Sequence, residues 1–540
     1  MKRPTVTKKI KEIFILNRKE IVFIVLLLIV AAFFRFWHLG ITQFITYDQA
    51  RDFLIIKRML VDHKLTLVGL TVLIPGVYLP PFYYYSLAPF LMLFRFHPLG
   101  ADVYTALLGL GAIFIFYLLC REIFDKLTAA LSSLVFAVLP VIVSTTRHAW
   151  NPNTAHFFSL FFGFFIFKFI KGNNWGWFYA ACAVFGFSLN FHFSLLALAP
   201  LIVIAFFFVV RKTKNFFPKL IISLFCLLVF ISPLFVFEIR HHFPISTNVL
   251  YFLTNSQGSG TGWFWSLGMS LKDIFRMPYL LFAGHLLPGV ESVNPSAIVL
   301  LDKLPLFKTS SYFWENFYQG FSFLIVFLIL LMTIISMLAK KIIKEKKGFY
   351  LILLWFLSGV GLRLILPSES FYYYQYNFLF PAVLFLLGNM AYVLSKKRSG
   401  LILVVVFISL ISIFSFLSLL KLPKSLRSES FFQPAVKIIA DDFSSDGSYY
   451  YVVAANNADP QRWDHNGLEY RYFLEAYFKL PVSNWDIEDY QQAEILYLID
   501  EGDLKEPLNL GGMEMEAFAP QKIEKTWLTE NERKIYKMTK

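Results

Sequence analysis

Residues 400–420 read GLILVVVFISLISIFSFLSLL, an apolar run without a single charged side chain. An α-helix rises about 1.5 Å per residue, so a run of this length can cross the roughly 30 Å hydrocarbon layer of a membrane. Comparable runs recur from residue 20 onward, and 57% of the chain is hydrophobic, with 63 Phe among its 540 residues. This composition excludes an ordinary soluble domain and predicts a polytopic all-α membrane protein.

The apolar length of each run predicts about eleven transmembrane helices. They are expected at residues 20–38, 102–121, 127–145, 154–171, 175–190, 193–210, 220–237, 318–339, 349–366, 375–395 and 400–420. A further apolar segment, residues 81–96, is short and contains Pro89. We interpret this segment as an interfacial or re-entrant helix, because a crossing here would move the later basic loops to the opposite side of the membrane.

The formal net charge of +14 comes from short basic segments beside the apolar runs. These segments are residues 1–19, 211–219, 340–347 and 396–398, and all of them should face the cytoplasm. Such loops indicate topology and an attraction to anionic membrane lipids, so nucleic acid is not an expected partner. No small-residue cleavage site follows the first run, which is therefore expected to stay as an anchor in the cell membrane.

The chain divides into three regions by composition. Residues 1–19 form the basic cytoplasmic N-terminus, and residues 20–420 form the transmembrane domain, with outer loops 39–101 and 239–316. The tail, residues 431–540, carries 20 Asp and Glu against 11 Lys and Arg. Strands are expected at 449–453 and 493–499 with a helix at 467–479 between them, which predicts a small extracytoplasmic α/β domain. All three cysteines lie in apolar runs, so neither a disulfide framework nor a cysteine metal site is expected.

This topology places the functional candidates on the outer side of the membrane. The candidate residues are Asp48, Arg51, Asp52, Tyr83, Arg147, His148, Asn151, His192, Glu238, Arg240 and Tyr373. Ionisable residues at membrane level are functional hypotheses by default.

Several candidates also have a structural interpretation. Asp48 could cap a helix over residues 49–60, since Asp is a favoured N-cap. Tyr83 could belong to an interfacial aromatic belt, and Arg147 could snorkel at a helix end. Glu238 and Arg240 could pair with each other.

Several motifs resemble the C-type superfamily of integral-membrane glycosyltransferases, and more narrowly the protein O-mannosyltransferase and aminoarabinose-transferase-like group of prokaryotes. The resemblance covers roughly residues 15–395. It rests on Tyr47-Asp48-Gln49-Ala50-Arg51-Asp52, Pro80-Pro81-Phe82-Tyr83-Tyr84, Arg147 with Trp150-Asn151-Pro152-Asn153, Asn190-Phe191-His192 and Glu238-Ile239-Arg240-His241. Two positions depart from the family pattern: Gln49 follows Asp48 where many members have Glu, and Leu79 precedes Pro80 where some members have a Lys near the donor phosphate.

The resemblance implies an inverting glycosyltransferase that moves a sugar from a polyprenyl phosphate to a glycan, lipid or protein acceptor on the outer face. Asp48 would be the general base. Arg51, Arg147 and Arg240 would hold the departing phosphate, because the fixed fork of a guanidinium suits phosphate oxygens. The remaining candidates would shape the substrate pocket.

No cofactor is expected. No obligatory metal is expected either, since the outer loops offer no compact ligand set.

Two other functions fit a multi-pass membrane protein. A transporter or lipid-linked glycan flippase would distribute polar residues through its spans and often repeat one half, whereas these spans are nearly uncharged in their middles. An oligosaccharide ligase or polymerase acting on lipid-diphosphate donors would share much of the layout. A nucleotide-driven pump is not expected, because the sequence contains no Gly-rich nucleotide-phosphate loop.

Overall fold

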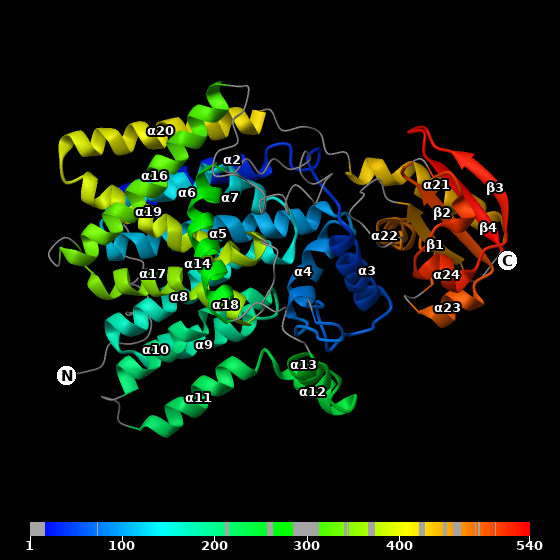
Figure 1. Cartoon of the computed structure of the whole chain (residues 1–540), viewed down its shortest axis with the longest axis horizontal. Coiled ribbons are helices and arrows are strands. Elements are labelled where there is room, and N and C mark those ends of the chain that lie inside the picture. Colours follow the sequence, from blue (N-terminus) through cyan, green and yellow to red (C-terminus); the bar gives the residue numbers. More distant parts are fainter. Residues whose placement is uncertain are drawn as a thin grey trace.

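The computed structural model of the chain describes residues 17–72, 74–210, 215–255, 263–283, 313–339, 343, 345–365, 373–420, 427–446, 451–456, 466–480, 482–483, 486–502 and 504–540. The apolar part is a bundle of helices, which Figure 1 shows running mostly along the long axis of the molecule. Its first half contains α2 (Arg18–Phe36), α3 (Tyr47–Val61), α4 (Phe82–Leu93), α5 (Leu99–Ile123), α6 (Lys126–Val138), α7 (Pro140–Thr145), the 3-10 turn η1 (Asn151–Thr154), α8 (Ala155–Gly172), α9 (Trp175–Ser188), η2 (Phe193–Leu198) and α10 (Ala199–Val210).

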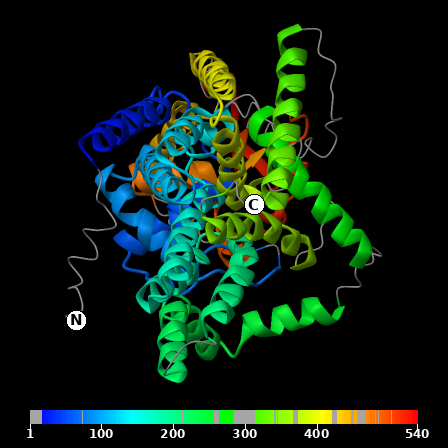
Figure 2. The same ribbon diagram turned by 90° about the vertical axis from the view of Figure 1, so that its left-hand side faces the viewer.

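The second half of the bundle continues to residue 420. It contains α11 (Phe216–Leu228), α12 (Ser232–Arg240), α13 (Pro244–Asn255), α14 (Trp263–Ala283), α16 (Phe313–Leu338), α17 (Lys346–Ser358), α18 (Val360–Ile365), η4 (Tyr373–Leu379), α19 (Phe380–Leu394) and α20 (Arg398–Leu420). Seen from the end in Figure 2, α2 and α20 lie on the outside of the bundle. Their exposed residues include Leu26 and Ile402, which suits helices that face lipid.

Four helices in the described part are long and apolar enough to cross a membrane. They are Leu99–Ile123, Asn151–Gly172, Tyr374–Leu394 and Arg398–Leu417. A bent pair, α11 and α12, makes a fifth if its two arms count as one span. The protein is thus a multi-pass membrane protein with a mostly helical fold, while the expected count of eleven spans remains a prediction.

Several expected spans are not single straight helices. The run at 127–145 is divided at Pro140 into α6 and α7, because a proline removes a helical N–H and clashes with the preceding turn. The run at 193–210 begins as a 3-10 helix, and α11 and α12 meet at 71°. Helix α4 covers the doubtful segment at 81–96; its 12 residues rise about 18 Å, which is too short to cross alone.

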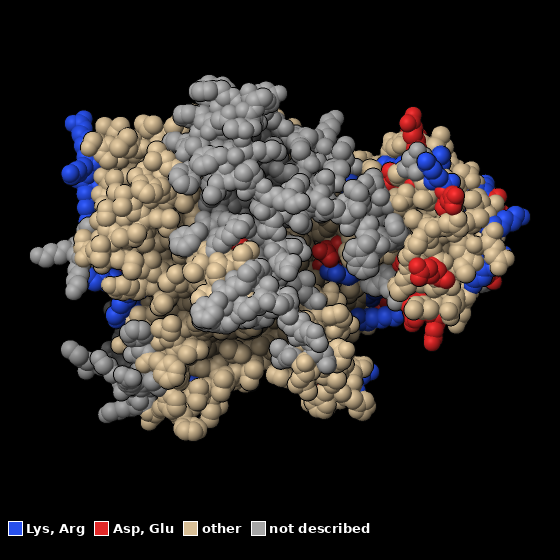
Figure 3. All heavy atoms as spheres, viewed as in Figure 1, with Lys and Arg blue, Asp and Glu red and all other residues tan. Residues whose placement is uncertain are grey.

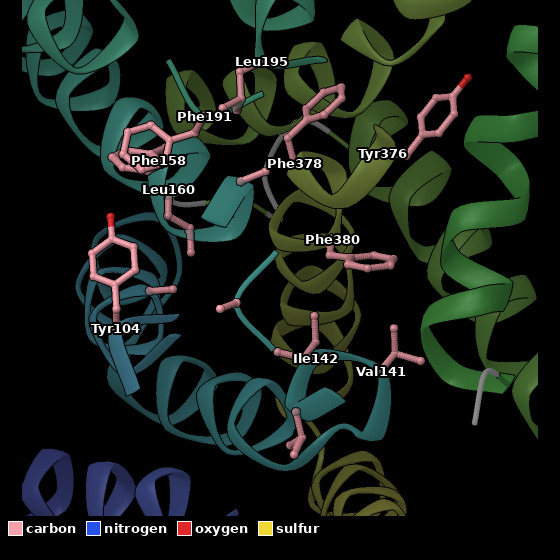
Figure 4. Packing of buried hydrophobic residues seen from close by; sticks show 14 of the residues in the cluster. Tyr104, Val141, Ile142, Phe158, Leu160, Phe191, Leu195, Tyr376, Phe378 and Phe380 are labelled. Atoms are coloured by element: carbon pink, nitrogen blue, oxygen red, sulfur yellow. The ribbon is translucent and has the colours of Figure 1, made fainter. Parts of the chain in front are cut away.

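Aromatic and aliphatic side chains fill the middle of the bundle. Figure 4 shows Tyr104, Ile142, Phe158 and Phe380 from four different helices meeting there. Close contact also depends on small residues: a Cβ at Gly163 of α8 would lie 2.6 Å from the Trp355 ring of α17.

The C-terminal region forms a four-stranded sheet in the order β1-β2-β4-β3. Its elements are α21 (Glu429–Asp446), β1 (Tyr451–Asn456), α22 (Leu468–Tyr477), α23 (Ile487–Gln492), β2 (Ile495–Asp500), η5 (Pro507–Asn509), α24 (Met513–Phe518), β3 (Lys522–Leu528) and β4 (Lys534–Thr539). Strands β1 and β2 are parallel, with Tyr451 opposite Ile495, and the other two pairings are antiparallel. The two expected strands and the helix between them correspond to β1, β2 and α22, although residues 449–450 lie outside the described part.

Helix α3 lies between the bundle and the C-terminal sheet (Figure 1). Glu475 of α22 accepts hydrogen bonds from Arg58 Nε at 3.1 Å and from Lys57 Nζ at 3.4 Å. The rings of Phe53 and Tyr472 pack with centroids 5.5 Å apart. The C-terminal region is therefore docked on the helix that carries Asp48.

Charged side chains are unevenly distributed over the visible surface of the molecule. In Figure 3, Lys and Arg gather at the end of the bundle farthest from the sheet, whereas most of the visible Asp and Glu lie on the C-terminal region. This distribution matches the basic loops and the acidic tail of the sequence.

Candidate active site

The first turn of α3 carries Asp48. The helix begins at Tyr47 because Thr46 is its N-cap: the Thr46 hydroxyl accepts from the Gln49 N–H, and Gln49 Oε1 accepts from the Thr46 N–H at 2.9 Å. The structure therefore corrects the alternative in which Asp48 caps the helix. Asp48 lies in the first turn, two residues after the N-cap, where the helix dipole favours negative charge.

Arg51 lies between two carboxylates of the same helix. Its Nη1 is 3.1 Å from Asp48 Oδ1, and its Nε and Nη2 donate to Asp52 Oδ1 at 3.0 and 2.9 Å. The Asp48 side chain is 40% exposed, whereas that of Asp52 is 2% exposed. Asp48 is thus the carboxylate that a substrate could reach, and Asp52 holds Arg51 from behind.

Burial disfavours the charged form of Asp52. It raises the pKa of the Asp52 carboxyl to about 7, although Arg51 acts in the opposite direction. Tyr84 Oη also donates to Asp52 Oδ1 at 3.3 Å. Asp52 therefore titrates near neutral pH in contact with the candidate phosphate-binding cation.

A row of three aromatic rings, each from a different segment, begins at Asp48. Trp150 Nε1 donates to Asp48 Oδ2 at 3.3 Å. The Trp150 and Tyr374 rings pack with centroids 4.6 Å apart, and the His192 ring lies 6.1 Å from that of Tyr374. Three segments that are distant in the sequence therefore form an aromatic wall next to an exposed carboxylate.

His192 belongs to this wall as a neutral ring. Its Nδ1 is 2.7 Å from Ser194 Oγ, and the ring is buried. Burial lowers the pKa of His192 to about 3, so the imidazole carries no charge at neutral pH. This position suits shape and hydrogen bonding rather than charge stabilisation.

Arg147 is fully buried, and its contacts are structural. Its guanidinium donates at 2.7 Å to three acceptors, which are the carbonyls of Phe34 and Trp37 and the hydroxyl of Thr42. These carbonyls lie at the end of α2, where a helix leaves its last carbonyls without intrahelical partners. The contacts favour a clamp between α7 and α2 over a phosphate site.

Glu238 and Arg240 lie at the end of α12. Glu238 accepts from the backbone N–H groups of Ile245 and Ser246 at 2.7 and 3.0 Å, so it caps the start of α13. Arg240 is exposed. No contact in the described part joins either residue to Asp48, and their alternative pairing with each other is also not seen there.

Of the remaining candidates, Asn151 and Tyr83 make contacts with residues other than Asp48. Asn151 Nδ2 donates to the Phe191 carbonyl at 2.8 Å, which fixes the segment after Trp150. Tyr83 is buried with its ring 5.6 Å from that of Phe191. Both ring nitrogens of His148 are buried without a hydrogen-bond partner among the described residues. The side chain of Tyr373 lies outside the described part.

Four contributors were not among the candidates: Gln49, Asp102, Trp150 and Tyr374. The Thr46–Gln49 spacing is a capping-box pattern and could have indicated Gln49. Asp102 is an acidic residue inside an expected span, which is a recognised functional signal. Nothing in the sequence indicated that Trp150 would reach Asp48, because the contact depends on tertiary packing.

Within the residues that the structure describes, no group of three or more His, Cys, Asp or Glu side chains could hold a metal ion. At this site the position between Asp48 and Asp52 is taken by the Arg51 guanidinium.

Comparison with known proteins connects this fold to a class of enzymes. Residues 79–236 match the family model described as dolichyl-phosphate-mannose-protein mannosyltransferase. The oligosaccharyltransferase of Archaeoglobus fulgidus, solved with a tethered acceptor peptide, has a TM-score of 0.50 at 12% identity, covering 85% of this chain and 63% of that one. ArnT from Cupriavidus metallidurans bound to undecaprenyl phosphate has 14% identity and a TM-score of 0.43, covering 96% and 97%. No curated protein matches the chain.

The sequence match and the shared fold confirm the expected resemblance to membrane-embedded glycosyltransferases. Over residues 79–236 the chain is similar to enzymes of this class, which favours an enzyme over the transporter and flippase alternative. Asp48 lies before the matched segment, and its role is argued below from the geometry of the site.

Asp52 makes the site sensitive to pH. Above pH 7 the Asp52 carboxylate is charged and offsets Arg51, so we expect the KM for an anionic lipid-phosphate donor to rise about tenfold between pH 6 and pH 8. Asp52→Asn should keep the low KM throughout this range. Because the pKa is raised in the folded state, the contribution of Asp52 to stability also falls as the pH rises from about 4 through 7. Steady-state kinetics at each pH would test the predicted rise in KM. The same dependence of KM on pH in wild type and in Asp52→Asn would contradict the prediction.

Proposed function

We propose that the protein is an inverting glycosyltransferase that moves a sugar from a polyprenyl phosphate to a glycan, lipid or protein acceptor. The observation that carries this proposal is the exposed Asp48 carboxylate, which is held between the Arg51 guanidinium and the Trp150 indole. Transfer of a sugar away from a phosphate needs a base to take the acceptor's proton and a cation to stabilise the departing phosphate.

In the proposed step, Asp48 takes the proton of the acceptor's O–H or N–H group. The acceptor atom attacks the anomeric carbon from the face opposite the phosphate, and the bond between that carbon and the phosphate oxygen breaks. Polyprenyl phosphate leaves with the electron pair, and Arg51 stabilises its charge. One displacement of this kind inverts the anomeric centre.

The aromatic wall supports a sugar-binding role. Trp150 and Tyr374 offer ring faces beside the carboxylate, and aromatic rings are apolar bodies on which the C–H face of a sugar can pack. His192, Asn151 and Tyr83 would shape this pocket from behind.

We propose that the reaction takes place on the outer face of a prokaryotic cell membrane, with the N-terminus in the cytoplasm. The basic end of the bundle in Figure 3 supports this orientation through the positive-inside rule. Helix α3, which carries Asp48, lies toward the opposite end of the bundle and contacts the acidic C-terminal region. That region would stand outside the membrane, above the site.

Transfer is tested directly with purified protein in lipid nanodiscs. A panel of radiolabelled polyprenyl-phosphate sugars is incubated with the protein and a cell-envelope acceptor fraction, and label leaving the lipid is measured. Lipid-diphosphate oligosaccharides form the second arm, because they are the donors of the ligase or polymerase alternative. Turnover of a monophosphate donor supports the proposal, whereas turnover of diphosphate donors alone would overturn it.

Arg51 is the cation expected to act on the donor phosphate. Arg51→Met should lower kcat/KM by about 10²- to 10³-fold, the typical loss when a preorganised charge-stabilising group is removed. Arg51→Lys should recover part of this, because Lys keeps the charge but not the fork of donors. Arg95→Met is the control, since Arg95 is an exposed arginine just after α4. Equal kinetics in Arg51→Met and the control would exclude this role for Arg51.

A further inference from the structure

The peptide before Trp150 is held from both sides. The Ala149 N–H donates to Asp102 Oδ1 at 2.9 Å, and the Ala149 carbonyl accepts from Gln49 Nε2 at 3.0 Å. Asp102, Gln49 and Ala149 are all buried. Trp150 therefore follows a fixed peptide that lies directly against the first turn of α3.

Asp102 also binds the segment that leads into α3. Its second oxygen, Oδ2, accepts from Gln43 Nε2 at 2.8 Å. Gln43 lies between the end of α2 and the start of α3, whereas Ala149 follows α7. A single carboxylate near the start of α5 thus joins the two segments that supply Asp48 and Trp150.

We infer that Asp102 is a positioning residue for catalysis that acts on Asp48 through Trp150. The inference rests on the proposed function, in which Asp48 is the base. The contacts of Asp102 are with Gln43 and Ala149, so it does not touch the Asp48 carboxylate. By fixing Ala149 it fixes the indole N–H that binds Asp48 Oδ2. That bond orients the carboxylate.

Two substitutions of Asp102 show whether its hydrogen bonds are what catalysis needs. Asp102→Leu removes both acceptors. Asp102→Asn keeps an oxygen for Ala149, and its NH2 group can donate to Gln43 once the Gln43 amide turns over. We expect Asp102→Leu to lower kcat about ten- to hundred-fold with the donor KM unchanged. Asp102→Asn should stay near wild type.

A double-mutant cycle tests whether Asp102 acts through Trp150. Trp150→Phe removes the indole N–H and should itself lower kcat, again with the donor KM unchanged. The double variant should then match Trp150→Phe alone, because the link that Asp102 supports is already gone. Thr105→Val is the matched control: Thr105 lies one turn further along α5, and its hydroxyl bonds only to the Ala101 carbonyl of its own helix among the described contacts.

Independent, multiplicative losses of kcat in the double variant would overturn the inference, as would a wild-type kcat in Asp102→Leu. If Asp102→Leu does not fold, Gln43→Leu takes its place in the cycle, with a smaller loss of kcat in the same direction. If wild-type protein uses no polyprenyl-phosphate donor, the proposed function fails instead. The double-mutant cycle is then measured as changes in the thermal unfolding temperature. Additive changes in the two single variants would refute the link between Asp102 and Trp150.

Discussion

Asp48→Asn is expected to lower kcat by about 10²- to 10⁴-fold, the usual contribution of a positioned general base. An asparagine has nearly the same shape and keeps an oxygen for the Trp150 N–H, but it cannot take the acceptor's proton. The donor KM should change much less than kcat, because Arg51 and the aromatic wall remain in place. Initial rates of label transfer with saturating donor and acceptor would measure the effect.

Asp62→Asn is the matched control for this variant. Asp62 is the C-cap residue of the same helix α3, with its carboxylate 3.8 Å from Lys57 Nζ and far along the helix from Asp48. It should transfer sugar at the wild-type rate. Transfer by Asp48→Asn at that rate would exclude Asp48 as the base, while leaving the enzyme class untouched.

The sequence predicted the region of the site better than its details. The motif at residues 47–52 indicated a catalytic carboxylate near the start of a juxtamembrane helix, and α3 lies there. From the sequence, only Asp48 was considered as the cap of this helix, although the Thr46–Gln49 capping-box spacing favours Thr46. The difference matters, because the oxygens of a capping carboxylate would accept hydrogen bonds from backbone N–H groups. The Asp48 oxygens instead contact Arg51 and Trp150.

Contacts between segments that are distant in the chain could not be predicted from the sequence. Ala149 lies 100 residues after Gln49 and 47 after Asp102, yet both side chains bind its peptide group. Residue type and spacing carry no signal for such a meeting, which arises from the packing of α3, α5 and the end of α7. Glu238 shows the same limit: the sequence made it a pocket candidate, and its oxygens cap α13.

The C-terminal region was predicted as strands and a helix, but not as a neighbour of the site. Periodicity identifies β1, α22 and β2 because each has a regular apolar pattern. The ion pairs of Glu475 with Lys57 and Arg58 depend instead on docking. Since α3 carries Asp48 at one end and these pairs near the other, the docked region braces the helix from which the proposed base projects.

Arg147→Met is expected to destabilise the protein by several kcal/mol, because each buried acceptor left unsatisfied costs about 1–3 kcal/mol. The substitution leaves the carbonyls of Phe34 and Trp37 without their donors at the end of α2. Thermal unfolding in detergent should move to a clearly lower temperature, and the yield of folded protein should fall. Arg147→Lys should recover only part of the loss, because a lysine ammonium is a point charge and does not reproduce a fork that spans three acceptors.

The kinetic readout decides between a clamp and a phosphate site at Arg147. For a clamp, the folded fraction of Arg147→Met keeps the wild-type donor KM, because the guanidinium makes its bonds inside the protein. For a phosphate site, KM rises while the unfolding temperature stays near that of wild type. Arg95→Met again serves as the control for loss of a positive charge, with neither quantity expected to change. A raised KM at unaltered stability would return Arg147 to the phosphate site and reduce the share of the reaction assigned to Arg51.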